Sequence, residues 1–285
     1  MEPESKVFDS GVAGTRLVVF GAIHGNEHCG PTAIRSIMQQ IEDGRIPLLA
    51  GSVRFVPVCN PRAFEQNVRA TEENLNRVFK KIASPTSYEA ELANRLCGLL
   101  DQSADMLLDI HSTSAPGPMS VFTDYPSPEV DALARSLGPK CIILDWPKVY
   151  ENDPLGFASS CTSDYAHSIG IPSATVECGQ HDDPESVAVA EVAILRALAH
   201  AGIIKRDREE LPTPARISMR YLAMKSSDAD AFTKRWEHLE LIPRGAIIAT
   251  RAYGSDIRAD EDLVMILPKH HAKAGEEWFY VGVMT

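Results

Sequence analysis

Short apolar runs alternate with amphipathic stretches from about residue 16 to residue 204. This order is typical of βα units built around a parallel or mixed sheet, so the sequence predicts an α/β fold. Apolar residues at helical spacing predict covering helices around Ile34–Ile41 and Leu92–Leu100, and a third helix after Asp183 that continues towards Gly202. The predicted strands are residues 16–23, 52–59, 105–111, 119–123, 141–145 and 173–177.

The character of the chain changes after Lys205. A charged segment with two prolines reads as an exposed linker, so we place a domain boundary near residue 210. Beyond it, short alternating segments predict a small all-β domain. We therefore expect two domains: a catalytic domain of residues 1–209 and a small β-rich capping domain of residues 210–285.

Charge and cysteine content narrow the classes of partner. The chain has 28 Lys and Arg against 39 Asp and Glu, a net charge of −11, which disfavours nucleic acid and anionic membrane surfaces. Its six cysteines lack CxxC spacing, the first residues are acidic rather than signal-like, and no apolar run approaches the ~18 residues of a membrane span. We expect a soluble, cytoplasmic protein with a small-molecule substrate. The sequence leaves its oligomeric state open.

Polar residues that can carry chemistry fall where predicted strands end. His24 and Glu27 lie in a Gly-bounded turn after the first strand, His111 ends the third, and Glu177 ends the last. The carboxyl ends of such strands place their side chains at one edge of the sheet. Two His and one Glu are the ligand type of a catalytic zinc site, and Glu177 would then be the general base. Each feature taken alone also fits a hydrogen-bonded turn or a structural strand end.

Further motifs occur in a fixed order between residues 16 and 180, and with them the chain resembles the succinylglutamate desuccinylase/aspartoacylase family of the zinc carboxypeptidase superfamily. The resemblance implies a zinc-carboxypeptidase-like mixed twisted sheet with helices on both faces, plus the small C-terminal all-β domain. The matching segments are His24-Gly-Asn-Glu27, Asn60-Pro61-x-Ala63, Arg69, Leu75-Asn76-Arg77, Asp109-Ile110-His111 and Val176-Glu177-Cys178-Gly179.

The resemblance also implies roles for single residues. It gives one zinc ion per chain, held by His24, Glu27 and His111. It makes Glu177 the base that activates water and later protonates the leaving amine. Arg69 would stabilise the oxyanion. The substrate's α-carboxylate would be bound by Asn76 and Arg77.

Neighbouring residues extend the predicted site. Asp109 shares a strand face with His111 and is placed to accept its other ring proton. His28 and Cys29 are expected at the start of the next helix, in packing roles, and His181 near the pocket. The remaining His and the cysteines are expected to be structural.

The sequence departs from the family in two places. Residues 149–195 contain no Lys or Arg, so the cation that binds a second substrate carboxylate is missing, unless Arg251 or Arg258 replaces it. The tyrosine that the family's second domain contributes has Tyr253 and Tyr280 as candidates, and His270 and His271 occupy its approximate region. N-acetylaspartate is therefore expected to be a poorer substrate than neutral N-acyl amino acids.

The sequence thus predicts a zinc-dependent hydrolase that cleaves the amide bond of a small N-acyl amino acid. A zinc carboxypeptidase acting on a small peptide would use the same residues. A metal- or ligand-binding protein without turnover is the third hypothesis, which Glu177 argues against because a binder needs no base.

Overall fold

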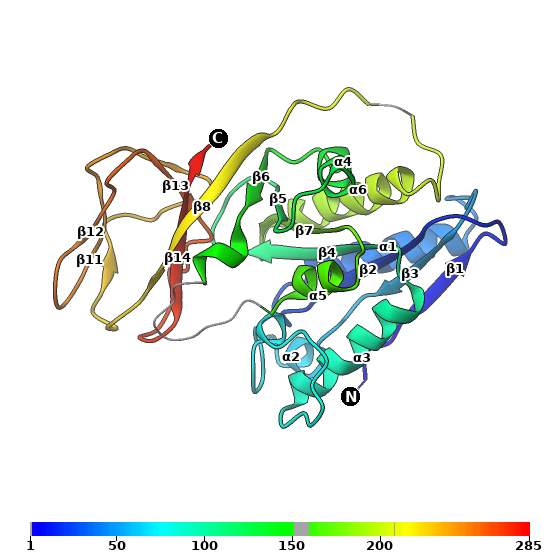
Figure 1. Cartoon of the computed structure of the whole chain (residues 1–285), viewed down its shortest axis with the longest axis horizontal. Helices are drawn as coiled ribbons and strands as arrows, with labels where there is room; N and C mark the ends of the chain where they lie inside the picture. Colours follow the sequence, from blue (N-terminus) through cyan, green and yellow to red (C-terminus); the bar gives the residue numbers. More distant parts are fainter. Residues whose placement is uncertain (1, 151–159, 208) are drawn as a thin grey trace.

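The computed structural model describes residues 2–150, 160–207 and 209–285, which form a large twisted mixed sheet with helices on both faces (Figure 1). The eleven strands run in the order β1-β3-β2-β4-β7-β5-β6-β8-β14-β13-β10. A separate sheet has the order β12-β11-β9. The strands of the first part of the chain are β1 (Lys6–Asp9), β2 (Arg16–Gly21), β3 (Ser52–Val56), β4 (Met106–Thr113), β5 (Ser120–Thr123), β6 (Cys141–Leu144) and β7 (Ser173–Gln180).

The middle of the large sheet is parallel and buried. Strand β2 pairs in parallel with β3 and with β4, and β4 pairs in parallel with β7. All eight residues of β4 are buried, and the strand begins with the apolar run Met106–Leu108. The six predicted strands all occur. Strands β4 and β7 continue beyond His111 and Glu177, because their pairing extends to Thr113 and Gln180.

Helices cover both faces of this sheet, as predicted. On one face α1 (Cys29–Glu42), α4 (Pro128–Ser136) and α6 (Glu185–His200) share an apolar core. On the other face α3 (Tyr88–Ser103) and α5 (Thr162–Ser168) share a second core (Figure 1). The short elements α2 (Pro61–Glu65), η1 (Leu75–Arg77) and η2 (Trp146–Val149) lie in the connections.

The C-terminal residues are all-β, and they are joined to the large sheet. Strand β8 (Ala215–Met224) pairs in parallel with β6 and antiparallel with β14 (Glu277–Met284). The large sheet therefore continues past residue 210, and a domain boundary at that residue stays a prediction. The other strands of this region are β9 (Ala231–Phe232), β10 (Leu241–Ile242), β11 (Ile247–Thr250), β12 (Ile257–Arg258) and β13 (Leu263–Ile266).

Two general expectations can be compared with this fold. All six cysteines are buried, in keeping with packing roles. Among the described residues, no helix combines the length and the apolar character needed to cross a membrane.

Candidate active site

The turn that carries His24 and Glu27 leaves β2 and lies tightly against α2. Gly25 makes this approach possible, because a Cβ atom there would lie 2.1 Å from the carbonyl carbon of Ala63. The Gly25 N–H donates to the carbonyl of Arg69 at 3.2 Å, and the Glu27 N–H donates to that of His24 at 3.2 Å. The glycine of the motif thus fixes where the two polar side chains point.

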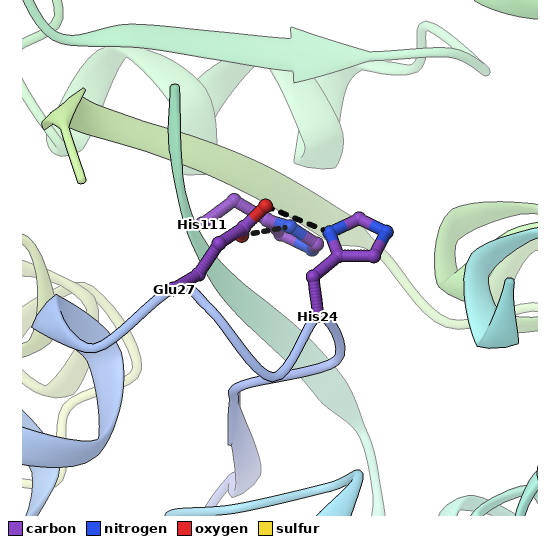
Figure 2. A group of neighbouring side chains, drawn as sticks. All are labelled: His24, Glu27 and His111. Carbon is purple, nitrogen blue, oxygen red and sulfur yellow. Dashed lines mark hydrogen bonds and ion pairs between the residues drawn. The ribbon is translucent and has the colours of Figure 1, made fainter. Parts of the chain in front are cut away.

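The side chains of His24, Glu27 and His111 point toward one another (Figure 2). Glu27 Oε1 lies 2.8 Å from His24 Nδ1, and Glu27 Oε2 lies 2.8 Å from His111 Nδ1. All three side chains are almost fully buried. Their candidate ligand atoms lie within 4.8 Å of one another, which is close enough for one metal ion. Three protein ligands leave a fourth tetrahedral position for water or substrate.

The outer nitrogen of His24 shows which tautomer this ring adopts. His24 Nε2 lies 3.1 Å from Asn74 Oδ1, and that oxygen also accepts the Asn76 backbone N–H at 3.0 Å. Asn74 therefore presents its oxygen, and Nε2 must donate the proton. Burial, followed by the Arg69 charge, lowers the pKa of His24 to about 3, so the ring is neutral. Its Nδ1 lone pair then faces the Glu27 carboxylate.

A lone pair facing a carboxylate oxygen at 2.8 Å is repulsive unless a cation lies between them. The donor set therefore fits a divalent metal ion. His111 differs from His24, because its Nε2 lies 3.0 Å from Asp109 Oδ2 on the same strand face but makes no hydrogen bond with a described residue. Thr162 Oγ1 donates to the same Asp109 oxygen at 2.6 Å. Burial alone would lower the pKa of His111, but Asp109 and Glu27 raise it well above its ordinary value.

Glu177 lies beside this group on β7, directly opposite His111 in the β4–β7 register. It is 8% exposed, and no described residue donates a hydrogen bond to its Oε2. Burial raises its pKa to about 8, against the opposing effect of His111 and with a smaller contribution from the Glu27 charge. A carboxylate with an unsatisfied oxygen next to three metal-ligand side chains can accept a proton from a water molecule.

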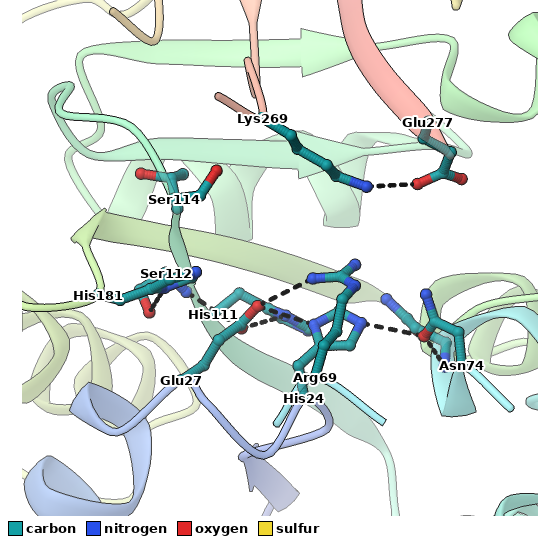
Figure 3. Close-up of polar contacts among 12 residues, drawn as sticks. His24, Glu27, Arg69, Asn74, His111, Ser112, Ser114, His181, Lys269 and Glu277 are labelled. Carbon is teal, nitrogen blue, oxygen red and sulfur yellow. Dashed lines mark hydrogen bonds and ion pairs between the residues drawn. The ribbon is translucent and has the colours of Figure 1, made fainter. Parts of the chain in front are cut away.

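Arg69 lies beside His24 and Glu27 (Figure 3). Its Nη1 is 3.4 Å from Glu27 Oε1, and its side chain is 38% exposed. The loop that carries it is held by Glu89, whose buried carboxylate accepts five hydrogen bonds. These come from the backbone and side chain of Thr71, the backbones of Glu72 and Glu73, and the Asn60 amide.

Arg77 lines the same cavity and already has a carboxylate partner. Its Nε and Nη2 lie 3.1 and 2.7 Å from Glu277 Oε1, and Nη2 also donates to Tyr150 at 2.9 Å. The other Glu277 oxygen accepts from Lys269 Nζ at 2.8 Å (Figure 3). Asn76 Oδ1 accepts the Thr162 backbone N–H at 3.1 Å, so only its NH₂ group is left to donate. Two cations and one anion give this wall of the cavity a net charge of +1.

The C-terminal region contributes to the cavity differently from what the sequence indicated. The cation that it supplies is Lys269, whereas Arg251 bonds Ser226 and Arg258 bonds the Gly245 carbonyl. Of the two tyrosine candidates, Tyr280 lines the cavity and Tyr253 is 82% exposed. His270 and His271 also line it.

Other predicted neighbours lie where their spacing placed them. His28 is the N-cap residue of α1 and Cys29 is the first residue of that helix. His181 lines the cavity, with its Nδ1 2.8 Å from Ser112 Oγ (Figure 3). Sequence reasoning missed Asn74, Glu89, Asp124, Lys269 and Glu277. Only Asn74 had a usable signal, since it lies two residues before the predicted Asn76-Arg77 pair.

Comparison with known proteins gives the family that the sequence motifs indicated. Residues 13–201 match the model of the succinylglutamate desuccinylase/aspartoacylase catalytic domain, and the chain belongs to this family. The family consists of hydrolases.

Two curated relatives are each called a probable aspartoacylase. The protein of Nostoc sp. is 29% identical over 121 residues, 40% of this chain and of the relative. That of Acaryochloris marina is 26% identical over 166 residues, 54% of this chain and 55% of the relative. The chain thus matches about half or less of the length of these relatives.

Among solved structures, the succinylglutamate desuccinylase/aspartoacylase of Rhodobacter sphaeroides superposes with a TM-score of 0.79 at 18% identity. The match covers 100% of this chain and 89% of the other, and it establishes a shared fold.

Proposed function

We propose that this protein is a zinc-dependent hydrolase that cleaves the amide bond of small N-acyl amino acids. The observation that carries the proposal is the convergence of His24, Glu27 and His111, whose candidate ligand atoms lie within 4.8 Å of one another. The free oxygen of Glu177 beside it supports turnover rather than binding alone. Family membership supports deacylation.

His24, Glu27 and His111 would hold the zinc ion, which when bound polarises a carbonyl group and lowers the pKa of a water molecule. Glu177 takes the proton of the attacking water and returns it to the leaving amine nitrogen. The Arg69 guanidinium, partly exposed beside Glu27, donates to the carbonyl oxygen as negative charge develops there.

Asn76 and Arg77 bind the α-carboxylate of the substrate. The net charge of +1 on the Arg77–Glu277–Lys269 wall matches one carboxylate. A second carboxylate, as in N-acetylaspartate, would find each cation already paired: Arg69 with Glu27, and the other two with Glu277. Neutral N-acyl amino acids are therefore expected to be hydrolysed faster than N-acetylaspartate.

The test is hydrolysis of a panel of N-acyl amino acids and short peptides, before and after chelation and after zinc is restored. We expect N-acyl amino acids to be cleaved, with activity lost to the chelator and recovered with zinc. Glu177→Gln should lower turnover by at least ~10²-fold while keeping the metal. Cleavage of peptides alone would favour a carboxypeptidase, and metal binding without any hydrolysis would favour a binding protein. Near-normal turnover of Glu177→Gln would reassign the base.

A further inference from the structure

The end of the cavity away from the metal-ligand residues has its own wall. Asp124 directly follows β5, which pairs antiparallel with β7 so that Ser120 lies opposite Glu177 and Phe122 opposite Thr175. Because alternate residues of a strand share a face, Asp124 continues the face that carries Phe122, Thr175 and Glu177. Phe122, Thr175, Glu177 and Asp124 all line the cavity. Asp124 therefore lies on the wall that begins at Glu177, two strand positions beyond Phe122.

The Asp124 carboxylate has an incomplete set of partners. It accepts a hydrogen bond from Ser163 Oγ, whereas its Oδ1 is buried and receives no donor from any residue that the structure describes. Burial raises the pKa of Asp124 to about 7, the nearby Asp164 and Asp145 charges act in the same direction, and the Arg77 charge opposes them. Arg77 is already bonded to Glu277. A buried acceptor without a donor is costly, so a ligand that supplies one is stabilised here.

Aromatic rings form another wall of this end of the cavity, and the Arg77 guanidinium lies 5.2 Å from one of them, that of Trp146. Phe122 and Trp146 line it, with their rings 5.4 Å apart and nearly perpendicular, and Tyr280 lies against Trp146 at 4.7 Å between centroids. Such walls cover methylene groups and tolerate a cation near their faces. Apolar sides that end in a carboxylate match a short aliphatic chain with a terminal ammonium group.

We propose that Asp124 receives an ammonium group on the side chain of the substrate, so that the preferred substrates are Nα-acyl diamino acids. The inference rests on the proposed function, which places the scissile amide at His24, Glu27 and His111 and the α-carboxylate at Arg77. The substrate side chain then has the Phe122–Asp124 wall left to occupy. An anionic side chain would meet the Asp124 carboxylate, and an apolar one would leave Asp124 Oδ1 without a donor.

The experiment compares pairs of substrates that differ in charge and little in shape. Nα-acetyl-L-ornithine and Nα-acetyl-L-norleucine have side chains of equal length, and so do the 2,4-diaminobutyrate and norvaline derivatives. A charge-assisted hydrogen bond predicts that kcat/KM of the zinc-loaded wild type is about 10- to 150-fold higher for the cationic member. Asp124→Asn should reduce this ratio to about threefold or less, since an amide keeps the shape without the charge.

Glu276→Gln is the matched control, because Glu276 lines the same cavity but is exposed. It should leave the ratio close to the wild-type value. If both variants lower the ratio of kcat/KM for cationic over apolar substrates equally, the overall charge of the cavity causes the preference for cationic substrates. That result would overturn the role of Asp124. A wild-type ratio near 1, with good turnover of the norleucine derivative, would overturn it while leaving the proposed function intact.

Calorimetric binding of L-ornithine and L-norleucine to the same proteins separates the two proposals if no substrate is hydrolysed. Preferential binding of ornithine that Asp124→Asn abolishes would support the subsite although the proposed function had failed. Equal binding of both amino acids would overturn the subsite as well.

Discussion

Acid is expected to loosen the cavity wall through His238, which joins the C-terminal region to the large sheet. The ring is 2% exposed, and its Nδ1 accepts the Leu267 backbone N–H at 3.1 Å. Its Nε2 therefore carries the proton and donates to Ser120 Oγ at 2.9 Å. A second proton would have to displace the Leu267 bond. Burial accordingly lowers the pKa of His238 to about 3.

The size of the effect follows from the difference between the folded and unfolded states. An unfolded histidine has a pKa of about 6.5, so as the pH falls below that value only the unfolded state gains the proton. The stabilisation is complete above the unfolded pKa and decreases towards the folded pKa. Between pH 7 and pH 5 the difference amounts to about 2 kcal/mol in the free energy of unfolding. Raising the folded pKa by a unit hardly changes this figure, because both values lie well below pH 5.

Urea unfolding at pH 7 and pH 5 of the wild type and His238→Gln measures this difference. Chelator-treated protein should be used so that metal release does not contribute. The free energy of unfolding of the wild type should fall by about 2 kcal/mol more than that of the variant, which has no titrating ring. His271→Gln, at an exposed position, should behave as the wild type. Parallel pH dependences of wild type and His238→Gln would refute the assignment.

Three further variants test the metal-ligand group and its support. Glu27→Gln should lower the metal content after dialysis, measured by elemental analysis, because an amide is a weaker ligand than a carboxylate. Asn74→Ala removes the acceptor that orients His24, so zinc affinity in competition with a chromophoric chelator should fall by about 10- to 100-fold. Glu89→Gln should destabilise the fold at pH 7 by about 1.5–3 kcal/mol in urea unfolding. Burial alone would raise the pKa of Glu89, but its hydrogen-bond donors lower it. The carboxylate therefore stabilises the fold above its unfolded pKa of about 4.3, and this stabilisation is lost as the pH falls through the folded pKa. The difference in the free energy of unfolding between wild type and variant should decrease in acid.

The predicted metal-ligand residues and Glu177 share one property: each lies in or next to a buried strand of the parallel part of the sheet. His24 and Glu27 follow β2, His111 is on β4 and Glu177 is on β7. Apolar runs of this kind reveal where such strands lie, and parallel pairing brings equivalent positions to one edge. The convergence of these side chains was therefore a consequence of fold class.

The partners from the C-terminal region could not be predicted in this way. Glu277 reaches Arg77 across 200 residues, and the contact depends on how β14 pairs with β8 and β8 with β6. No local pattern encodes that registry. Residues 149–195 contain no Lys or Arg, but Lys269 lines the same cavity from another strand connection. Asp124 carried no signal because a single Asp after a short strand is an ordinary turn residue.

The pairing of β6 with β8 has a mechanical consequence. Four backbone-paired positions, from Cys141 with Ala215 to Leu144 with Ser218, tie the C-terminal strands to the sheet that carries Glu177. The two regions cannot move apart as rigid bodies without breaking this ladder, and the exposed residues His271 and Glu276 lie where the cavity meets the surface. A chain cut at residue 209 would also leave the apolar β6 as a bare sheet edge, inviting edge-to-edge aggregation.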